Sequence, residues 1–379
     1  MVSSNDAAFA LETDFDTEGQ KNASVNAHRL CSPTSSTSAA AGNDLIGEAI
    51  KTQGLHGRTA EIIKASCRQS TKCQYTSYPK RWKVFCIRQN CNPFRPVVDV
   101  VLAFLTELFE LGLGYSSLNT ARSAISAVMQ SDQGKKTVGA HPKIIRFMKG
   151  GYELRTPVPR YQHTWDVHIV LNHFKTLEQN EDLSLEDLAK KMCALLLLVT
   201  AQRVQTLHMI KLSCVHVHDK GCTIQIVDKL KHSRPGHHQS ALELKRFEQD
   251  QKLCVVNCLS EHIQKTRTVR NDTDQLLLCY TKPFGPARKV NIARWLKSVL
   301  LDAGIQNFAP HSFRGATASA MFDSGSSVDD ILKSAGWSKA GTFCKFYKKP
   351  IEEKDKQVKE ENSICRYFEL KPKMGSNTE

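Results

Sequence analysis

The sequence has no long apolar run, and this absence excludes a membrane-spanning helix, which needs roughly 20 such residues. The longest near-continuous apolar stretch, residues 192–201, is half that length. The first residues lack a basic segment followed by an apolar core, so no secretory signal is expected. We therefore expect a chain with no membrane partner.

A disulfide framework is also missing. The 13 cysteines are an odd number, spread from Cys31 to Cys365 over 379 residues. This pattern is typical of reduced thiols in an intracellular compartment. Internal repeats, coiled-coil heptads and clustered carboxylates for a pair of metal ions are absent as well.

The charge of the chain is strongly of one sign. Lys and Arg together number 52 against 38 Asp and Glu, which gives a net charge of +14 at pH 7. Residues 1–55 hold 3 basic and 7 acidic side chains, so residues 56–379 carry the whole excess, with 49 basic and 31 acidic. A body this basic indicates a polyanionic partner, nucleic acid before a membrane surface.

Composition and hydrophobic periodicity divide the chain into four segments. Residues 1–55 are expected to be a disordered acidic arm, because residues 32–43 (SPTSSTSAAAGN) are small and polar. A helical domain is predicted for residues 56–156 and a second domain for 160–355, followed by a tail over 356–379.

The helical domain is predicted from apolar residues at three- and four-residue spacing over 98–109. A second helix follows from Ser116 or Ser117 as N-cap, and a third spans 78–87, with basic residues between its aromatic ones. Gly150 and Gly151 are expected to end the domain.

The second domain is predicted to be mainly helical with a small antiparallel sheet. Residues 222–227 alternate with period two, residues 233–236 form a turn, and 239–244 return as the partner strand. Helices are predicted at 167–177, 188–199, 257–266, 292–303 and 312–322.

Three segments that lie far apart in the sequence carry polar groups suited to catalysis or binding. Arg203 directly follows an apolar helix, His311 and Arg314 are spaced i, i+3, and Tyr347 follows the dipeptide Gly336-Trp337 by ten residues. Each feature alone is more typical of an ordinary capping or surface residue.

The order of these segments resembles that of the tyrosine recombinases, the phage-integrase family. The resemblance covers about residues 75–350 and includes APHSFRGAT (309–317), AGWS (335–338) and TFCKFY (342–347). Residues 78–86 (YPKRWKVFC) and 115–126 (YSSLNTARSAIS) are similar to that family's SAM-like core-binding domain. The segment AQRVQTLH at 201–208 is similar to the corresponding segment in recombinases of DIRS- and Crypton-type eukaryotic mobile elements.

The resemblance implies an enzyme that cuts and rejoins DNA through a 3′-phosphotyrosyl link to Tyr347. Arg203 and Arg314 would hold the phosphate oxygens bidentately, and His311 would bind the phosphate or move a proton. Trp337 would donate its indole N–H or support the tyrosine ring. No cofactor, metal ion or small-molecule substrate is expected.

A lysine beside the hairpin turn is implied as the general acid for the leaving 5′-oxygen. Lys229 and Lys231 compete for this role, and Lys231 matches the family position better. Further contacts to double-stranded DNA are expected from Lys80, Arg81, Lys83, Arg122, Lys229 and Arg234. The resemblance also implies a homotetramer on DNA and a nuclear location.

Some features depart from the family pattern or allow other interpretations. Thr206 stands where many members carry an acidic residue, and the Trp337–Tyr347 spacing is one residue longer than usual. Pro79 either lies in the first turn of a helix or signals a degenerating copy. A decayed copy that only binds DNA and a type IB topoisomerase are the rival functions. Zinc at Cys254, Cys258 and His262 is less favoured than a helix with a buried thiol face.

Overall fold

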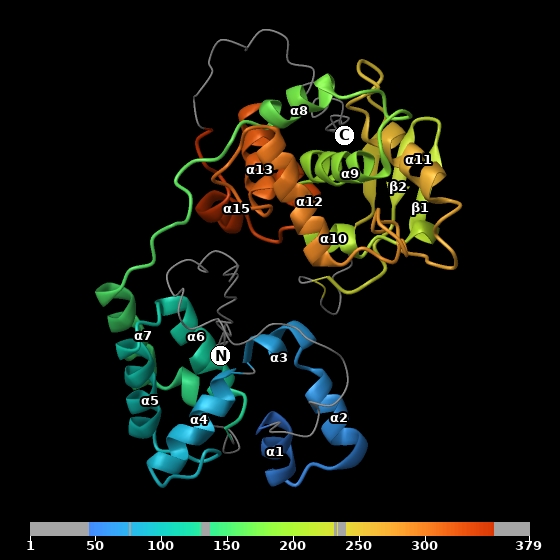
Figure 1. Cartoon of the computed structure of the whole chain (residues 1–379). Helices are drawn as coiled ribbons and strands as arrows, with labels where there is room; N and C mark the ends of the chain where they lie inside the picture. The colour runs from blue at the N-terminus through green and yellow to red at the C-terminus, as the bar shows by residue number, and fades with distance from the viewer. Residues whose placement is uncertain (1–44, 76, 130–136, 231–232, 234–239, 352–379) are drawn as a thin grey trace, which may run out of the picture. The chain divides into compact units, whose positions relative to one another are not determined.

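The chain folds as two compact units, and the boundary between them in the sequence lies between Arg160 and Tyr161 (Figure 1). The computed structural model describes residues 45–75, 77–129, 137–230, 233 and 240–351. Within these ranges no helix combines the length and the apolar character needed to cross a membrane.

The described residues of the first unit form helices joined by loops, without a strand. Its elements are α1 (Leu45–Thr52), α2 (Gly57–Ala65), α3 (Gln69–Tyr75), α4 (Ser77–Arg88), α5 (Val98–Glu110), α6 (Tyr115–Ser126), η3 (Val138–Ala140) and α7 (Pro142–Leu154). The predicted apolar stripes of α4, α5 and α6 face one another and form the core of the unit. Within this core the rings of Trp82, Phe85 and Phe104 pack with centroids 5.2–5.9 Å apart.

Pro79 lies in the first turn of α4. The first four N–H groups of a helix have no intrahelical partner, so the missing N–H of a proline at the third position costs no hydrogen bond. Pro79 is itself buried, and Trp82 of the next turn donates its indole N–H to the carbonyl of Pro93 at 3.0 Å. The proline is therefore compatible with an intact helix.

Several sequence expectations for this unit are wrong. Residues 45–52 form helix α1 instead of continuing a disordered arm, because Leu45 and Ala49 pack against Val128. Residues 1–44 lie outside the described part of the chain. Helix α6 begins two or three residues earlier than expected, with Gly114 as N-cap. Helix α7 continues through Gly150 and Gly151 to Leu154.

The second unit is built around one buried helix, α9 (Leu185–Thr200), which packs against α11, α12 and α13 (Figure 1). The remaining elements are α8 (Val167–Thr176), α10 (Val204–His208), η4 (Leu212–Cys214), β1 (Val215–His218), β2 (Gly221–Ile224), β3 (Leu242–Lys245), α11 (Val255–Thr266), α12 (Lys289–Asp302), α13 (Ser312–Asp323), α14 (Val328–Ala335) and α15 (Ala340–Phe346). Neighbouring helices cover α9 on several sides, which explains why its sequence is apolar almost all round.

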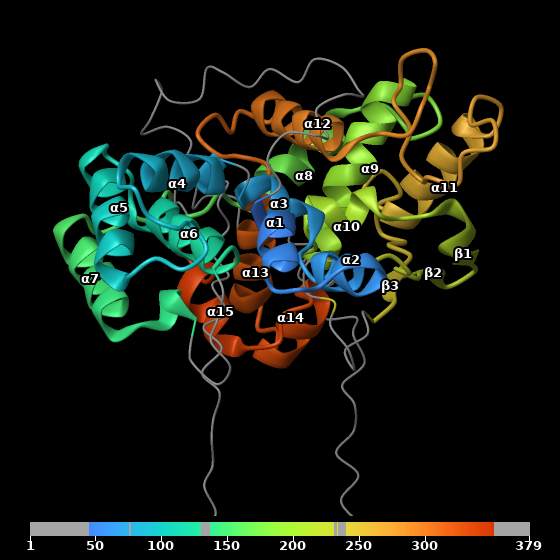
Figure 2. The same ribbon diagram turned by 90° about the horizontal axis from the view of Figure 1, so that it is seen from below.

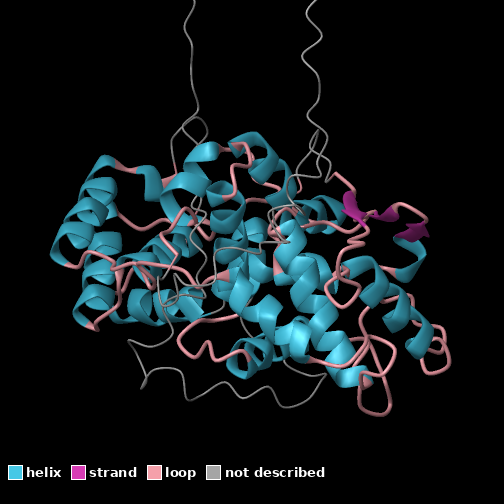
Figure 3. Cartoon of the chain, turned by 90° about the horizontal axis from the view of Figure 1, so that it is seen from above, coloured by secondary structure: helices cyan, strands magenta, loops and turns pink. Residues whose placement is uncertain are grey.

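A three-stranded antiparallel sheet in the order β1-β2-β3 lies at one side of the unit (Figure 3). The predicted hairpin is present, with Ile224 paired to Leu242, but β2 ends at Ile224, three residues before the predicted end. Strand β1 has no counterpart among the predictions. A Cβ atom at Gly221 would overlap the carbonyl oxygen of Leu244, so glycine is required at this close approach.

Candidate functional site

The site begins where helix α9 ends. Ala201 adopts a left-handed conformation (φ 51°) and closes the helix with a 2.9 Å hydrogen bond from its N–H to the carbonyl of Leu197. A left-handed alanine costs roughly 1–2 kcal/mol, so neighbouring contacts must hold it. The chain then turns directly into α10 with Arg203 as N-cap, which leaves this guanidinium on a half-buried turn.

Arg314 supplies one of the contacts that hold this turn. Its side chain is 1% exposed, and Nη1 donates a 2.7 Å hydrogen bond to the carbonyl of Ala201. The centre of its guanidinium lies 4.1 Å from the centroid of the Trp337 ring and 5.6 Å from that of Tyr347. A buried cation is costly unless it is paired, and here a carbonyl and two aromatic faces surround it.

Trp337 reaches this position because α14 ends in a Schellman turn. Gly336 takes the left-handed conformation (φ 67°), and the N–H of Trp337 bonds to the carbonyl of Leu332 at 2.9 Å. The Trp337 side chain is 8% exposed, and its Nε1 has no hydrogen-bond partner among the described residues. An indole N–H in this condition can donate to an incoming acceptor.

Tyr347 is the C-cap of α15, and its ring lies beside Arg314 and Trp337. Helices α13 to α15 lie together in Figure 2. The Tyr347 ring lies 4.6 Å from the Trp337 ring, centroid to centroid, and its hydroxyl is 3.3 Å from Nε2 of His311. The hydroxyl oxygen is thus within hydrogen-bond reach of a group that can take its proton.

The backbone of Tyr347 is fixed by a buried serine of α13. Ser319 is 1% exposed, and its hydroxyl donates to the Tyr347 carbonyl at 2.8 Å while it accepts from the N–H of Lys349 at 3.2 Å. The following residues return to the start of the unit, where the N–H of Thr164 donates to the carbonyl of Pro350 at 2.9 Å. Tyr347 is therefore held within the site of its own chain.

The structure brings four of the six predicted catalytic residues together. His311, Arg314, Trp337 and Tyr347 share direct contacts, and Arg203 lies two residues from the carbonyl that Arg314 binds. This set offers guanidinium and indole donors to an anion beside a hydroxyl nucleophile. Such an arrangement suits attack on a phosphodiester, where negative charge grows on the phosphorus oxygens.

The sixth predicted residue, Lys231, lies outside the described residues, as does Arg234. Lys229 is exposed and lies five residues beyond the end of β2. Lys229 therefore lies in the connection after β2 and not in the strand itself.

The predicted DNA contacts of the first unit have different surroundings. Lys80 and Arg81 are exposed on α4. Lys83 lies 3.6 Å from a carboxylate oxygen of Glu48, and Arg122 donates to the carbonyl of Gly139 at 3.4 Å. The first two are thus the more accessible cations.

The cysteines and histidine considered for zinc form the buried thiol face of α11. The Cys258 thiol donates to the carbonyl of Leu188 at 3.9 Å, and Cys254 accepts from the N–H of Phe247 at 3.3 Å. Burial raises the pKa of Cys258 to about 12 and lowers the pKa of His262 to about 3. These groups serve as core residues, as the sequence favoured.

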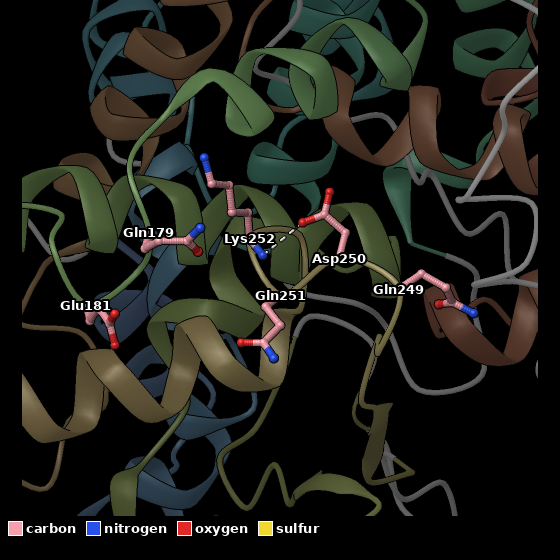
Figure 4. A pocket seen from close by; sticks show the side chains of 6 residues that line it. All are labelled: Gln179, Glu181, Gln249, Asp250, Gln251 and Lys252. Carbon is pink, nitrogen blue, oxygen red and sulfur yellow. Dashed lines mark hydrogen bonds between the residues drawn. The ribbon is translucent and has the colours of Figure 1, made fainter.

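A depression of about 420 Å³ is present elsewhere in the second unit (Figure 4). It is lined by Gln179, Glu181, Gln249, Asp250, Gln251 and Lys252. Lys252 donates from Nζ to the carbonyls of Lys175 and Leu177, and the Asp250 carboxylate accepts from the N–H of Lys252 at 2.9 Å. Its charged groups therefore cap a helix end and a turn, and it holds none of the predicted site residues.

Four polar residues that support the site were missed by sequence reasoning. They are Thr200, Gln202, Ser319 and Ser334, which contact the site through backbone carbonyls or N–H groups. The sequence gives no signal for these contacts, because the fold sets both the burial of these residues and their partners.

Comparison with solved structures identifies the fold. The Tn1549 transposon integrase in complex with transposon right end DNA matches with a TM-score of 0.51 at 11% identity, over 80% of this chain and 93% of that one. A lambda integrase dimer bound to a COC′ core site matches at 0.46 and 15% identity, over 84% and 78%. XerH site-specific recombinase bound to difH matches at 0.48 and 15% identity, over 67% of each chain.

The mainly helical second unit with its small antiparallel sheet therefore has the fold of a tyrosine-recombinase catalytic domain. Residues 171–353, which lie within the second unit, match the phage integrase family. None of the curated proteins matches the chain.

Proposed function

We propose that the protein is a site-specific DNA recombinase that cuts and rejoins strands through Tyr347. The observation that carries this proposal is the Tyr347 hydroxyl, 3.3 Å from His311 Nε2, on a ring whose centroid lies 5.6 Å from the buried guanidinium of Arg314. The match of residues 171–353 to the phage integrase family supports the proposal. The net charge of +14 supports it as well, because DNA is a polyanion.

In the proposed reaction the Tyr347 oxygen attacks a DNA phosphorus and its proton passes to His311. The bond from phosphorus to the 5′-oxygen breaks, and a 3′-phosphotyrosyl ester forms. Arg203 and Arg314 stabilise the charge on the non-bridging oxygens, and the indole N–H of Trp337 donates a further hydrogen bond. The ester conserves the energy of the broken bond, so rejoining needs no ATP.

Lys231 is proposed to protonate the leaving 5′-oxygen. The substitution Lys231→Ala should slow cleavage of normal DNA by roughly a hundredfold or more. A substrate with a bridging 5′-sulfur needs little protonation and should restore most of the rate. Lys229→Ala is the matched control, with weaker binding that is equal on both substrates. Rescue of the Lys229 variant alone would transfer the role to that lysine.

The proposed partner is double-stranded DNA, clamped by the first unit as a core-binding domain and the second as the catalytic domain. Lys80, Arg81, Lys83 and Arg122 of the first unit would contact phosphates. Exchange between two duplexes cuts four strands, and each chain supplies one Tyr347, so the proposed active form is a homotetramer. An origin in a DIRS- or Crypton-type mobile element and a nuclear location belong to the same proposal.

A nicked suicide duplex tests the proposal, because loss of the short strand beyond the nick traps the covalent complex. The wild type should form an adduct, and Tyr347→Phe should form none while its affinity for DNA stays within a few-fold. Tyr280→Phe, a tyrosine packed on Trp295 away from the site, is the matched control and should react normally. Wild-type protein that binds DNA without reacting would favour the rival function of a DNA-binding module.

A further inference from the structure

We propose that Gln202 is a positioning residue that keeps Trp337 and Arg203 in register with each other. The inference rests on the proposed function and names the group that assembles its site. Gln202 lies directly before Arg203 and is 1% exposed, so it acts without touching DNA.

Both ends of the Gln202 amide are engaged. Nε2 donates to the carbonyl of Ser334 at 2.7 Å, and Oε1 accepts from the hydroxyl of Thr206 at 3.0 Å. Ser334 lies three residues before Trp337, and Thr206 lies three residues after Arg203, inside α10. One side chain thus connects the segment that carries the tryptophan to the segment that carries the arginine.

The neighbouring residues strengthen the same junction. Thr200 accepts through its carbonyl from the Ser334 hydroxyl at 3.2 Å, and its own hydroxyl accepts from the N–H of Gln202 at 3.3 Å. Ala201, between them, receives Arg314. Helices α10, α13 and α14 are therefore connected through three consecutive residues, the last residue of α9 and the two that follow it.

The direction of the hydrogen bonds makes the amide specific. The Ser334 carbonyl can only accept, so the group that faces it must be a donor, and the opposite end must accept from Thr206. A carboxylate would place an acceptor against the carbonyl and repel it. A protonated carboxylic acid would restore both bonds, with O–H in place of N–H.

This requirement gives the Gln202→Glu variant a distinctive pH response. Burial raises the pKa of a carboxyl group, and the facing carbonyl raises it further. Arg203 and Arg314 are the charged groups closest to the junction and act in the opposite direction, while Lys333, beside Ser334, is exposed. The introduced carboxyl group should therefore be protonated in mildly acidic solution and ionised in basic solution.

The experiment measures single-turnover adduct formation from pH 5.5 to 8.5 relative to wild type. Gln202→Glu should approach the wild-type rate at the acidic end and lose roughly tenfold per pH unit above its pKa. DNA affinity should stay within about twofold, because the effect is on positioning. Gln205→Glu, the same change at a partly exposed position of α10, should keep a constant ratio to wild type.

Gln202→Met, which keeps the size and loses both bonds, should be slow at every pH. A wild-type rate for this variant, or a folded Gln202→Glu variant equally slow throughout, would overturn the inference. If Gln202→Met fails to fold, Thr206→Val removes one bond only and should slow the reaction about tenfold; an unchanged rate there would also overturn it.

Failure of the proposed function itself has a different signature. In that case the wild type forms no adduct at any pH, and the junction is followed by fluorescence instead. The emission of Trp337, isolated by subtracting the spectrum of a Trp337→Phe variant, should shift with pH in Gln202→Glu and stay constant in Gln205→Glu. A constant signal in both would contradict the positioning role.

Discussion

Arg314 and Lys191 are two buried cations on helices that pack against each other, yet their surroundings differ. Arg314 of α13, 1% exposed, donates to the Ala201 carbonyl and lies over the Trp337 ring. Lys191 of α9 is 0% exposed, and its Nζ has no hydrogen-bond partner among the described residues. Burial lowers the pKa of Lys191. The core holds the Lys191 amine at a cost in free energy, whereas the surroundings of Arg314 stabilise a charged guanidinium.

Two histidines show the same contrast. His262 is 0% exposed within the core, where burial lowers its pKa to about 3 and keeps it neutral. His311 is half-buried and its Nε2 faces the Tyr347 hydroxyl. The position in the fold, and not the residue type, therefore decides that His311 faces a reactive hydroxyl and that His262 packs in the core.

The largest expected effect is at Arg314. Arg314→Lys keeps the charge but loses the planar guanidinium, which binds the Ala201 carbonyl and is proposed to bind phosphate oxygens as well. Single-turnover cleavage should fall by about 10²–10³-fold, the loss typical of one transition-state donor. A rate within a few-fold of wild type would show that a point charge suffices and would remove the distinction from Lys191.

The next effect concerns His262 and the stability of the fold. Its folded pKa is depressed, so its contribution to stability is full above the unfolded value of about 6.5 and is lost as pH falls toward 3. The free energy of unfolding should decrease by up to about 1.4 kcal/mol per pH unit in this window from this group.

His262→Phe should remove that part of the slope in denaturant titrations at several pH values. The same slope in wild type and variant would mean that other groups govern the acid sensitivity. The variant should leave strand cleavage at neutral pH unchanged, because His262 lies in the core of α11.

The smallest effect is expected at Lys191. Lys191→Met keeps the volume and removes a buried charge, so the free energy of unfolding at pH 7 should rise by about 1 kcal/mol or more. Because the folded pKa of Lys191 is lowered, the gain should vanish above about pH 10.4, where the unfolded lysine also becomes neutral. Destabilisation at pH 7 would show that the ammonium group has a partner.

The main helices could be predicted from hydrophobic pattern, because α5 buries an apolar stripe and α9 is apolar almost all round. The sequence also pointed to His311, Arg314 and Tyr347, whose spacing carries information. It could not reveal α1, since its burial depends on Val128, about 80 residues away. Gln202 and Ser319 escaped prediction because each donates to a backbone carbonyl of a distant segment, and such a contact leaves no pattern of residue types.

The most direct test of the proposed function is to identify the residue attached to DNA. The trapped adduct is digested with protease and nuclease, and the DNA-linked peptide is sequenced by mass spectrometry. We predict a single modified peptide with a 3′-nucleotide phosphate on the Tyr347 oxygen. A link to another residue, or a 5′-phosphate at Tyr347, would contradict the proposed function.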